Sequence, residues 1–132
     1  MNYIIFYLST IIPLVLFDAL WILVLAKSFY ATQMGFLFSK SVNIIPVAFF
    51  YPIYAFAVLL LAVMPAISSG SWVSVLWRGA LLGLAAYGAY DLTNQATISG
   101  WPTLVTVVDI SWGVFVTALT SVVAYFIITA LK

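Results

Sequence analysis

The stretch YIIFYLSTIIPLVLFDALWILVLA, residues 3–26, decides the fold class of this chain. It carries one charged residue, Asp18, in an otherwise almost wholly apolar run. Because about 20 apolar residues form a helix that crosses the hydrocarbon core of a bilayer, this stretch predicts a membrane-spanning helix. It lacks the basic first region and the small-residue cleavage site of a signal peptide, so we expect the helix to be retained.

The composition extends this conclusion to the whole chain. Of its 132 residues, 67% are hydrophobic and 5% are charged, too few polar groups to cover the surface of a soluble domain. The length allows four spans with short connections and no separate soluble domain. We therefore expect residues 1–132 to form a single integral membrane domain whose main partner is the lipid bilayer.

The predicted fold is all-α: a bundle of four transmembrane helices with short loops. The expected spans are about 3–26, 46–67, 78–98 and 103–131. Pro46 and Pro65 mark the limits of the second span, Arg78 begins the third, and the turn at residues 100–102 begins the fourth. Trp72, Trp77 and Trp101 then fall at span ends, where an indole ring favours the headgroup region.

Residues 27–45, between the first two spans, also show helical periodicity. Tyr30, Met34, Leu37 and Phe38 recur at helical spacing, while Lys27, Thr32 and Lys40 fall elsewhere. This pattern predicts a short helix lying in the membrane interface. A helical extension of the first span fits the pattern equally well.

Two absences exclude many familiar functional sites. The chain contains no cysteine and no histidine, which excludes disulfides, thiolate nucleophiles, iron–sulfur clusters and His-ligated zinc or haem. We therefore expect no metal site and no cofactor. The net charge of +1 offers no basic patch for nucleic acid, so no nucleic-acid partner is expected.

The three aspartates, Asp18, Asp91 and Asp109, all fall inside predicted spans. The four basic residues fall at span ends or in loops, so no base is close enough along any helix to neutralise an acid. A charged side chain at the bilayer centre costs at least about 2.5 kcal/mol on insertion scales. Three such residues therefore suggest a function inside the membrane.

Depth places the three aspartates in one layer. We name the face that carries the loops at residues 27–45 and 99–101 side A. Counting about 1.5 Å per helical residue, all three aspartates lie roughly 10 to 12 Å below side A. The same count brings Tyr51 and Tyr54 of the second span into this layer.

Helical spacing adds further residues to the predicted site. The D-x-x-W motif occurs twice and puts Trp21 beside Asp18 and Trp112 beside Asp109, on one helix face in each case. Tyr87 and Asn94 lie close to Asp91 on the third span. The residues predicted to bind a ligand or protons are Asp18, Asp91, Asp109, Trp21, Trp112, Tyr51, Tyr54, Tyr87 and Asn94. Desolvation and mutual repulsion should keep some of these carboxyls protonated at neutral pH. The alternative is that these residues only form hydrogen bonds between helices.

Small and polar residues form a stripe on each of the last two spans. The third span carries Gly79, Gly83, Tyr87, Asp91 and Gln95 at intervals of four. The fourth span carries Thr106, Asp109, Gly113, Thr117, Thr120 and Ser121. We expect the two stripes to face each other, and we expect Gly79 and Gly83 to allow close packing on a neighbouring helix or on a second copy of the chain.

Several runs also resemble a known family. FDALW, FYATQMG, NIIPVAFFYPIY, GSW, the YDLTN-to-GWP run (residues 90–102) and VVDISWG are similar to the bacterial domain-of-unknown-function family 2177. The similarity covers nearly the whole chain, but the family commonly has leucine where Gln95 stands here. The resemblance implies a four-helix protein of the bacterial inner membrane and implies no activity.

The sequence leaves three classes of function open. The first is a membrane protein that binds or transports a cationic or amphiphilic solute in exchange for protons. The second is a non-catalytic subunit of a membrane complex, or a homodimer. The third is a membrane enzyme that acts on lipid or acyl chains with Asp91 or Asp109 as general acid or base. Whether the chain is an enzyme is therefore undecided.

Overall fold

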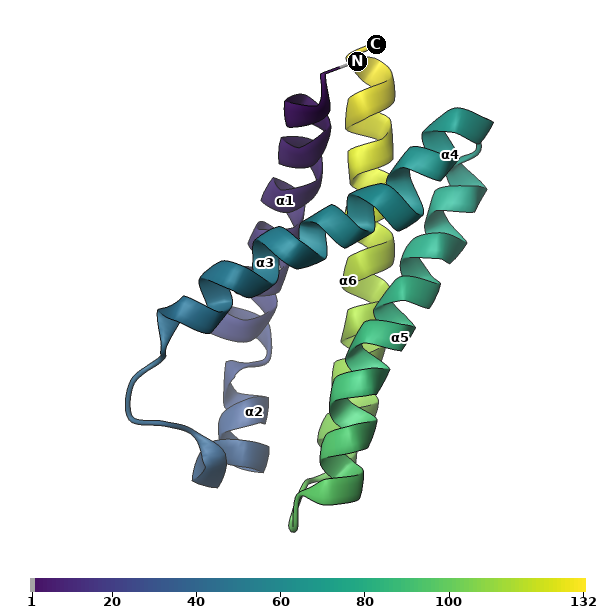
Figure 1. Cartoon of the computed structure of the whole chain (residues 1–132). Coiled ribbons are helices and arrows are strands. Elements are labelled where there is room, and N and C mark those ends of the chain that lie inside the picture. The colour runs from purple at the N-terminus through teal and green to yellow at the C-terminus, as the bar shows by residue number, and fades with distance from the viewer. Residues whose placement is uncertain (1) are drawn as a thin grey trace.

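A computed structural model describes residues 2–132, and every regular element in this range is helical (Figure 1). The elements follow in this order: α1 (Tyr3–Leu20), the π-helix η1 (Trp21–Leu25), α2 (Lys27–Met34), the 3-10 helix η2 (Gly35–Leu37), α3 (Ile44–Val58), the π-helix η3 (Leu59–Val63), α4 (Met64–Ser69), α5 (Trp72–Thr97) and α6 (Thr103–Ala130). The predicted all-α class is confirmed.

Within residues 2–132, three helical stretches are long and apolar enough to cross a membrane. They are Tyr3–Leu25, Ile44–Ser69 and Thr103–Ala130. The helix α5 is 26 residues long but is not among them, because Arg78, Asp91 and several Thr, Asn and Gln side chains lower its hydropathy. A multi-pass membrane protein is therefore supported, and the fourth span remains a prediction.

The second helical stretch, Ile44–Ser69, extends about two residues beyond each predicted limit of 46–67. The helix begins at Ile44, where the Asn43 side chain accepts a hydrogen bond from the Ile45 amide. It continues past Pro65 to Ser69; Pro65 has no N–H for the Leu61 carbonyl four residues earlier, and Arg78 donates to that carbonyl over 3.5 Å instead.

The predicted start of the third helix was wrong. Gly70 adopts a positive φ of 66° that ends α4, and the Ser71 side chain then caps α5 by accepting from the Ser74 amide. The helix therefore begins at Trp72, and Arg78 lies inside it rather than at its start.

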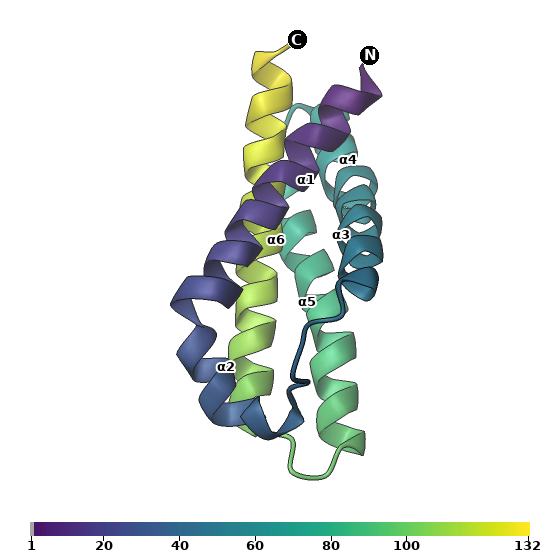
Figure 2. The ribbon, with the colours of Figure 1, turned by 90° about the vertical axis from the view of Figure 1, so that its left-hand side faces the viewer.

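The long helices pack side by side with the two termini at one end (Figures 1 and 2). Antiparallel α5 and α6 contact each other along most of their length, α1 packs antiparallel on α6, and α3 crosses α1. The turn between α4 and α5 lies near the termini. The helix α2 and the turn between α5 and α6 lie at the opposite end, which is side A.

Glycines bring α5 and α6 into close contact. A Cβ atom added at Gly79 would lie 2.7 Å from the Ser121 hydroxyl oxygen, and one added at Gly83 would lie 2.2 Å from the Gly113 carbonyl oxygen. The two predicted stripes therefore do face each other. Gly79 and Gly83 pack against α6 of the same chain, which is the first of the two alternatives given for this motif.

The segment after α1 forms a separate short helix. The π-helix η1 ends at Ala26, whose amide donates to the Trp21 carbonyl over 2.7 Å, and the non-helical backbone of Ala26 (φ −111°) separates η1 from α2. The predicted helix in residues 27–45 therefore exists as α2. Its location in the membrane interface remains a prediction.

Trp101 differs from the interfacial anchor that was predicted. It is only 9% exposed, and its indole N–H donates to the Thr106 hydroxyl over 3.0 Å. Its ring packs edge-on against Tyr90. Trp101 thus stabilises the turn between α5 and α6, whereas Trp72 and Trp77 are about half exposed, as an anchor should be.

Candidate functional site

Asp18 has a hydrogen-bond donor at each carboxylate oxygen. The Trp112 indole N–H donates to Oδ1 over 2.9 Å, and the Tyr51 hydroxyl donates to Oδ2. The carboxyl group is buried, and its two partners come from α6 and α3. Asp18 therefore connects α1, α3 and α6.

Asp109 receives its hydrogen bond from a residue that the sequence did not identify as part of the site. The Tyr30 hydroxyl in α2 donates to Asp109 Oδ1 over 2.6 Å, and the Trp21 indole N–H donates to the Tyr30 oxygen over 3.1 Å. Burial, followed by the hydrogen bond to Asp109, raises the pKa of Tyr30, so this hydroxyl remains a donor. Helical spacing had placed Tyr30 on an apolar face, but it could not show that this face turns back onto the bundle.

The two D-x-x-W motifs interact with each other across α1 and α6. Trp112 donates to Asp18 of the other motif, and Trp21 reaches Asp109 of the other motif through Tyr30. The two indole rings stack with centroids 4.4 Å apart and planes 5° apart. Because α1 and α6 are antiparallel, each indole lies near the aspartate of the other motif: Trp112 donates to Asp18 directly, and Trp21 is linked to Asp109 through Tyr30.

Asp91 lies in a different environment. It is fully buried, and among residues 2–132 neither of its carboxyl oxygens has a donor. Asp109 is the acidic neighbour of Asp91. Two ionised carboxylates are acceptors only, so a hydrogen bond between these two groups would require a proton on one of them.

The remaining predicted residues surround the carboxyl groups. The Tyr54 hydroxyl bonds to the Thr117 hydroxyl over 2.6 Å, so Tyr54 does not bind an aspartate. Tyr87 packs over Gly113, where an added Cβ would lie 2.1 Å from its ring. Asn94 is partly buried in α5, near Tyr90.

A groove of about 320 Å³ reaches Asp109 between α3, α5 and α6. We call it the acid groove. It is lined by Phe50, Ala86, Tyr87, Tyr90 and Asp109. Its residues belong to α3, α5 and α6, and the ribbons of α3 and α5 diverge towards side A (Figure 1). One carboxyl group and three aromatic rings therefore line a recess at the edge of the helices.

A second groove, of about 260 Å³, lies beside α2. We call it the α2 groove. It is lined by Ile22, Lys27, Tyr30, Met34 and Phe38. Tyr30 lines this groove and bonds to Asp109, which lines the other. The Tyr30–Asp109 hydrogen bond therefore links residues of the two grooves.

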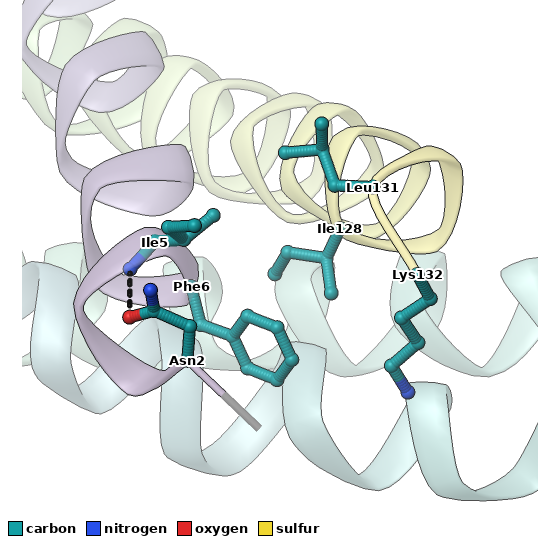
Figure 3. A pocket seen from close by; sticks show the side chains of 6 residues that line it. All are labelled: Asn2, Ile5, Phe6, Ile128, Leu131 and Lys132. Atoms are coloured by element: carbon teal, nitrogen blue, oxygen red, sulfur yellow. Dashed lines mark hydrogen bonds between the residues drawn. The ribbon is translucent and has the colours of Figure 1, made fainter.

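Another pocket, of about 410 Å³, lies at the opposite end of the molecule beside the two termini (Figure 3). Asn2 caps α1 there by accepting from the Ile5 amide, and the Lys132 ammonium lies 5.9 Å from the centre of the Phe6 ring. None of the aspartates lines this pocket. It is separate from the carboxyl groups.

A family model described as "Predicted membrane protein (DUF2177)" matches residues 3–126. The chain belongs to this family. The match includes all three aspartates and both D-x-x-W motifs, and it agrees with the three helices that can span a membrane. No curated protein and no solved structure matches the chain.

Membership of the DUF2177 family gives the chain a membrane location and assigns no chemistry. The groups that could carry chemistry are therefore those of the structure itself. Within residues 2–132, no group of three acidic side chains is arranged to hold a metal ion. The candidate groups are the carboxyl groups of Asp91 and Asp109, and Asp109 lines the acid groove.

Proposed function

We propose that α5 is a fourth membrane span. It is 26 residues long, roughly 39 Å at 1.5 Å per residue, which exceeds a hydrocarbon core of about 30 Å. It also packs along α6, which can itself span the membrane, so the two helices cover the same depth. The polar groups of α5 have local partners or are buried: Arg78 donates to Ser74 and to the Leu61 carbonyl, and Asp91 is enclosed.

We further propose that this protein binds a cationic amphiphile at Asp109 in exchange for a proton held by Asp91 and Asp109. The observation that supports this most strongly is the fully buried Asp91 carboxyl, which has no hydrogen-bond donor among residues 2–132 and has Asp109 as its acidic neighbour. Hydrogen bonds between helices would not need such a group, because Ser, Thr or Asn could form them at a lower insertion cost. A pair that holds and releases a proton does need it.

The acid groove favours an organic cation as the ligand. Phe50, Tyr87 and Tyr90 present aromatic rings beside the Asp109 carboxyl. Aromatic faces attract cations, and a carboxylate supplies the opposite charge, so an alkylammonium headgroup matches both. Because the groove lies at the diverging ends of α3 and α5, the alkyl chain of the ligand can remain in the lipid.

The exchange balances the charge of the site. A cation beside Asp109 disfavours the proton on the carboxyl pair, so binding releases a proton. One positive charge enters as another leaves, and the buried site keeps its net charge. This balance avoids the cost of an additional uncompensated charge inside the membrane.

Binding of dodecyltrimethylammonium to the purified protein in a non-ionic detergent tests this proposal. The matched control ligand replaces the trimethylammonium group by an uncharged tert-butyl group of the same shape. We expect the cation to bind with release of about one proton, measured by a pH dye in weak buffer, and the control to bind far more weakly.

Two variants of the protein test whether the cation binds at Asp109. Asp109→Asn should remove cation binding, whereas Asp18→Asn should retain it, because Asp18 contacts Tyr51 and Trp112 and lines no part of the acid groove. Equal binding of the two ligands would contradict the proposal, as would unchanged binding by the Asp109→Asn variant.

A further inference from the structure

The Tyr30–Asp109 hydrogen bond connects residues of two grooves. The acid groove is lined by the aromatic rings of Phe50, Tyr87 and Tyr90 and by Asp109. The α2 groove includes Lys27, an exposed side chain whose ammonium group requires water or lipid headgroups. Both grooves are lined mainly by apolar side chains, and each has one ionisable charged residue, Asp109 in the acid groove and Lys27 in the α2 groove.

The helix α2 is joined to the rest of the molecule mainly through its own neighbours in the chain. It packs chiefly on η1 and η2, and none of its residues is buried. Tyr30 is the residue of α2 whose side chain bonds to other helices, to Asp109 in α6 and to Trp21 in η1. These two bonds fix Tyr30 at the boundary between the α2 groove and the carboxyl pair.

We infer that the α2 groove is a proton route to Asp91 and Asp109 that is separate from the ligand route, and that Tyr30 relays the proton between them. The ligand half of this statement rests on the proposed function. The proton half rests on the geometry of Tyr30, Asp109 and the α2 groove. The Tyr30 oxygen accepts one bond from Trp21, so its second lone pair is free to accept from a water in the groove.

The relay step balances. The Tyr30 hydroxyl gives its proton to Asp109 Oδ1 along the existing hydrogen bond, and its oxygen takes a proton from hydronium in the α2 groove. One O–H bond breaks and one forms at Tyr30, one O–H bond forms at Asp109, and the hydronium becomes water. No electron is transferred, and the reverse sequence releases the proton to the same groove.

Exchange of the carboxyl proton for deuterium tests the relay without any ligand. The infrared band of a protonated carboxyl group shifts when D₂O replaces H₂O, and the rate of this shift measures access of solvent protons. We expect Tyr30→Phe, which retains the ring and removes the hydroxyl, to slow the exchange by about tenfold or more. Thermal melting and tryptophan circular dichroism would establish that the variant folds.

Cysteine modification supplies a second test that leaves the Tyr30–Asp109 bond in place. The chain has no natural cysteine, so a single introduced cysteine reacts alone. Met34→Cys places the thiol in the α2 groove, Ala86→Cys places it in the acid groove, and Thr32→Cys places it on the exposed face of α2 as the control. Each variant is treated with a bulky methanethiosulfonate reagent.

The proposal predicts a different outcome at each position. Modification at residue 34 should slow deuterium exchange and leave the equilibrium binding of dodecyltrimethylammonium unchanged. Modification at residue 86 should block that binding and leave exchange unchanged, and modification at residue 32 should affect neither. If exchange is equally fast after modification at residues 34 and 32, or in Tyr30→Phe, the α2 groove is not the proton route.

The two proposals can fail separately. If dodecyltrimethylammonium does not bind but Tyr30→Phe and modification at residue 34 slow exchange, the proton route stands and the proposed ligand is wrong. If the cation binds but residue 86 modification slows exchange instead of residue 34 modification, proton and ligand share one route and the relay is wrong.

Discussion

At the scale of single residues, the three aspartates have different surroundings although the sequence placed them in one layer. Asp18 accepts from Trp112 and Tyr51, Asp109 accepts from Tyr30, and Asp91 has no donor in the part of the chain that the structure describes. Helix counting predicts a common depth for them because helical rise is constant, and this depth stays a prediction. It could not predict which donor each receives, because that depends on how neighbouring helices rotate and cross.

Both carboxyl oxygens of Asp18 accept a hydrogen bond, and this predicts how its substitution changes stability. Asp18→Asn retains one acceptor for the Trp112 N–H and supplies an N–H₂ that can donate to the Tyr51 oxygen, so melting in detergent should change little. Asp18→Ala leaves both partners unsatisfied and should cost about 1 to 3 kcal/mol for each. Equal melting temperatures for Asp18→Asn and Asp18→Ala would contradict a structural role for this carboxyl group.

At the scale of helices, the sequence predicted the α5–α6 contact well and the α1–α2 region poorly. The stripes of small and polar residues on α5 and α6 repeat at the helical period, so their shared face could be read directly. The π-helix η1 and the break at Ala26 have no such pattern. These two features place Tyr30 on Asp109, and for this reason the sequence analysis missed Tyr30.

Two glycines of α5 provide a matched test of the α5–α6 contact. A Cβ at Gly83 would lie 2.2 Å from the Gly113 carbonyl oxygen, whereas a Cβ at Gly88 would lie 3.8 Å from the nearest atom, Leu92 Cδ1. Gly83→Ala should therefore lower the melting temperature in detergent by forcing the helices apart. Gly88→Ala should leave it unchanged or raise it, because alanine favours the helix by about 1 kcal/mol over glycine.

Oligomer size measured on the same variants separates packing within the chain from packing between chains. The Gly83 contact lies inside one chain, so Gly83→Ala should reduce stability without a specific loss of a dimer. A stable Gly83→Ala variant that dissociates from dimer to monomer would show that the glycine face binds a second copy instead.

At the scale of the whole molecule, this member of the DUF2177 family has one groove lined by Asp109 and another lined by Tyr30, which donates to Asp109. The sequence predicted an all-helical membrane protein because composition and span length dominate that choice. The grooves depend on the divergence of α3 from α5 and on the position of α2, which no local pattern specifies. The central claim is that Asp91 and Asp109 share a proton.

Infrared spectroscopy of the carboxyl groups at neutral pH tests this claim most directly. We predict the band of a protonated carboxyl group in the wild-type protein, its loss in Asp91→Asn, a shift of the band in Asp109→Asn and an unchanged band in Asp18→Asn. The buried Asp91 carboxyl keeps the proton when Asp109→Asn removes its acidic neighbour, so the band shifts rather than disappears, and Asp18 lies outside the pair. A wild-type protein with no protonated carboxyl band at neutral pH would contradict the shared proton and the exchange that depends on it.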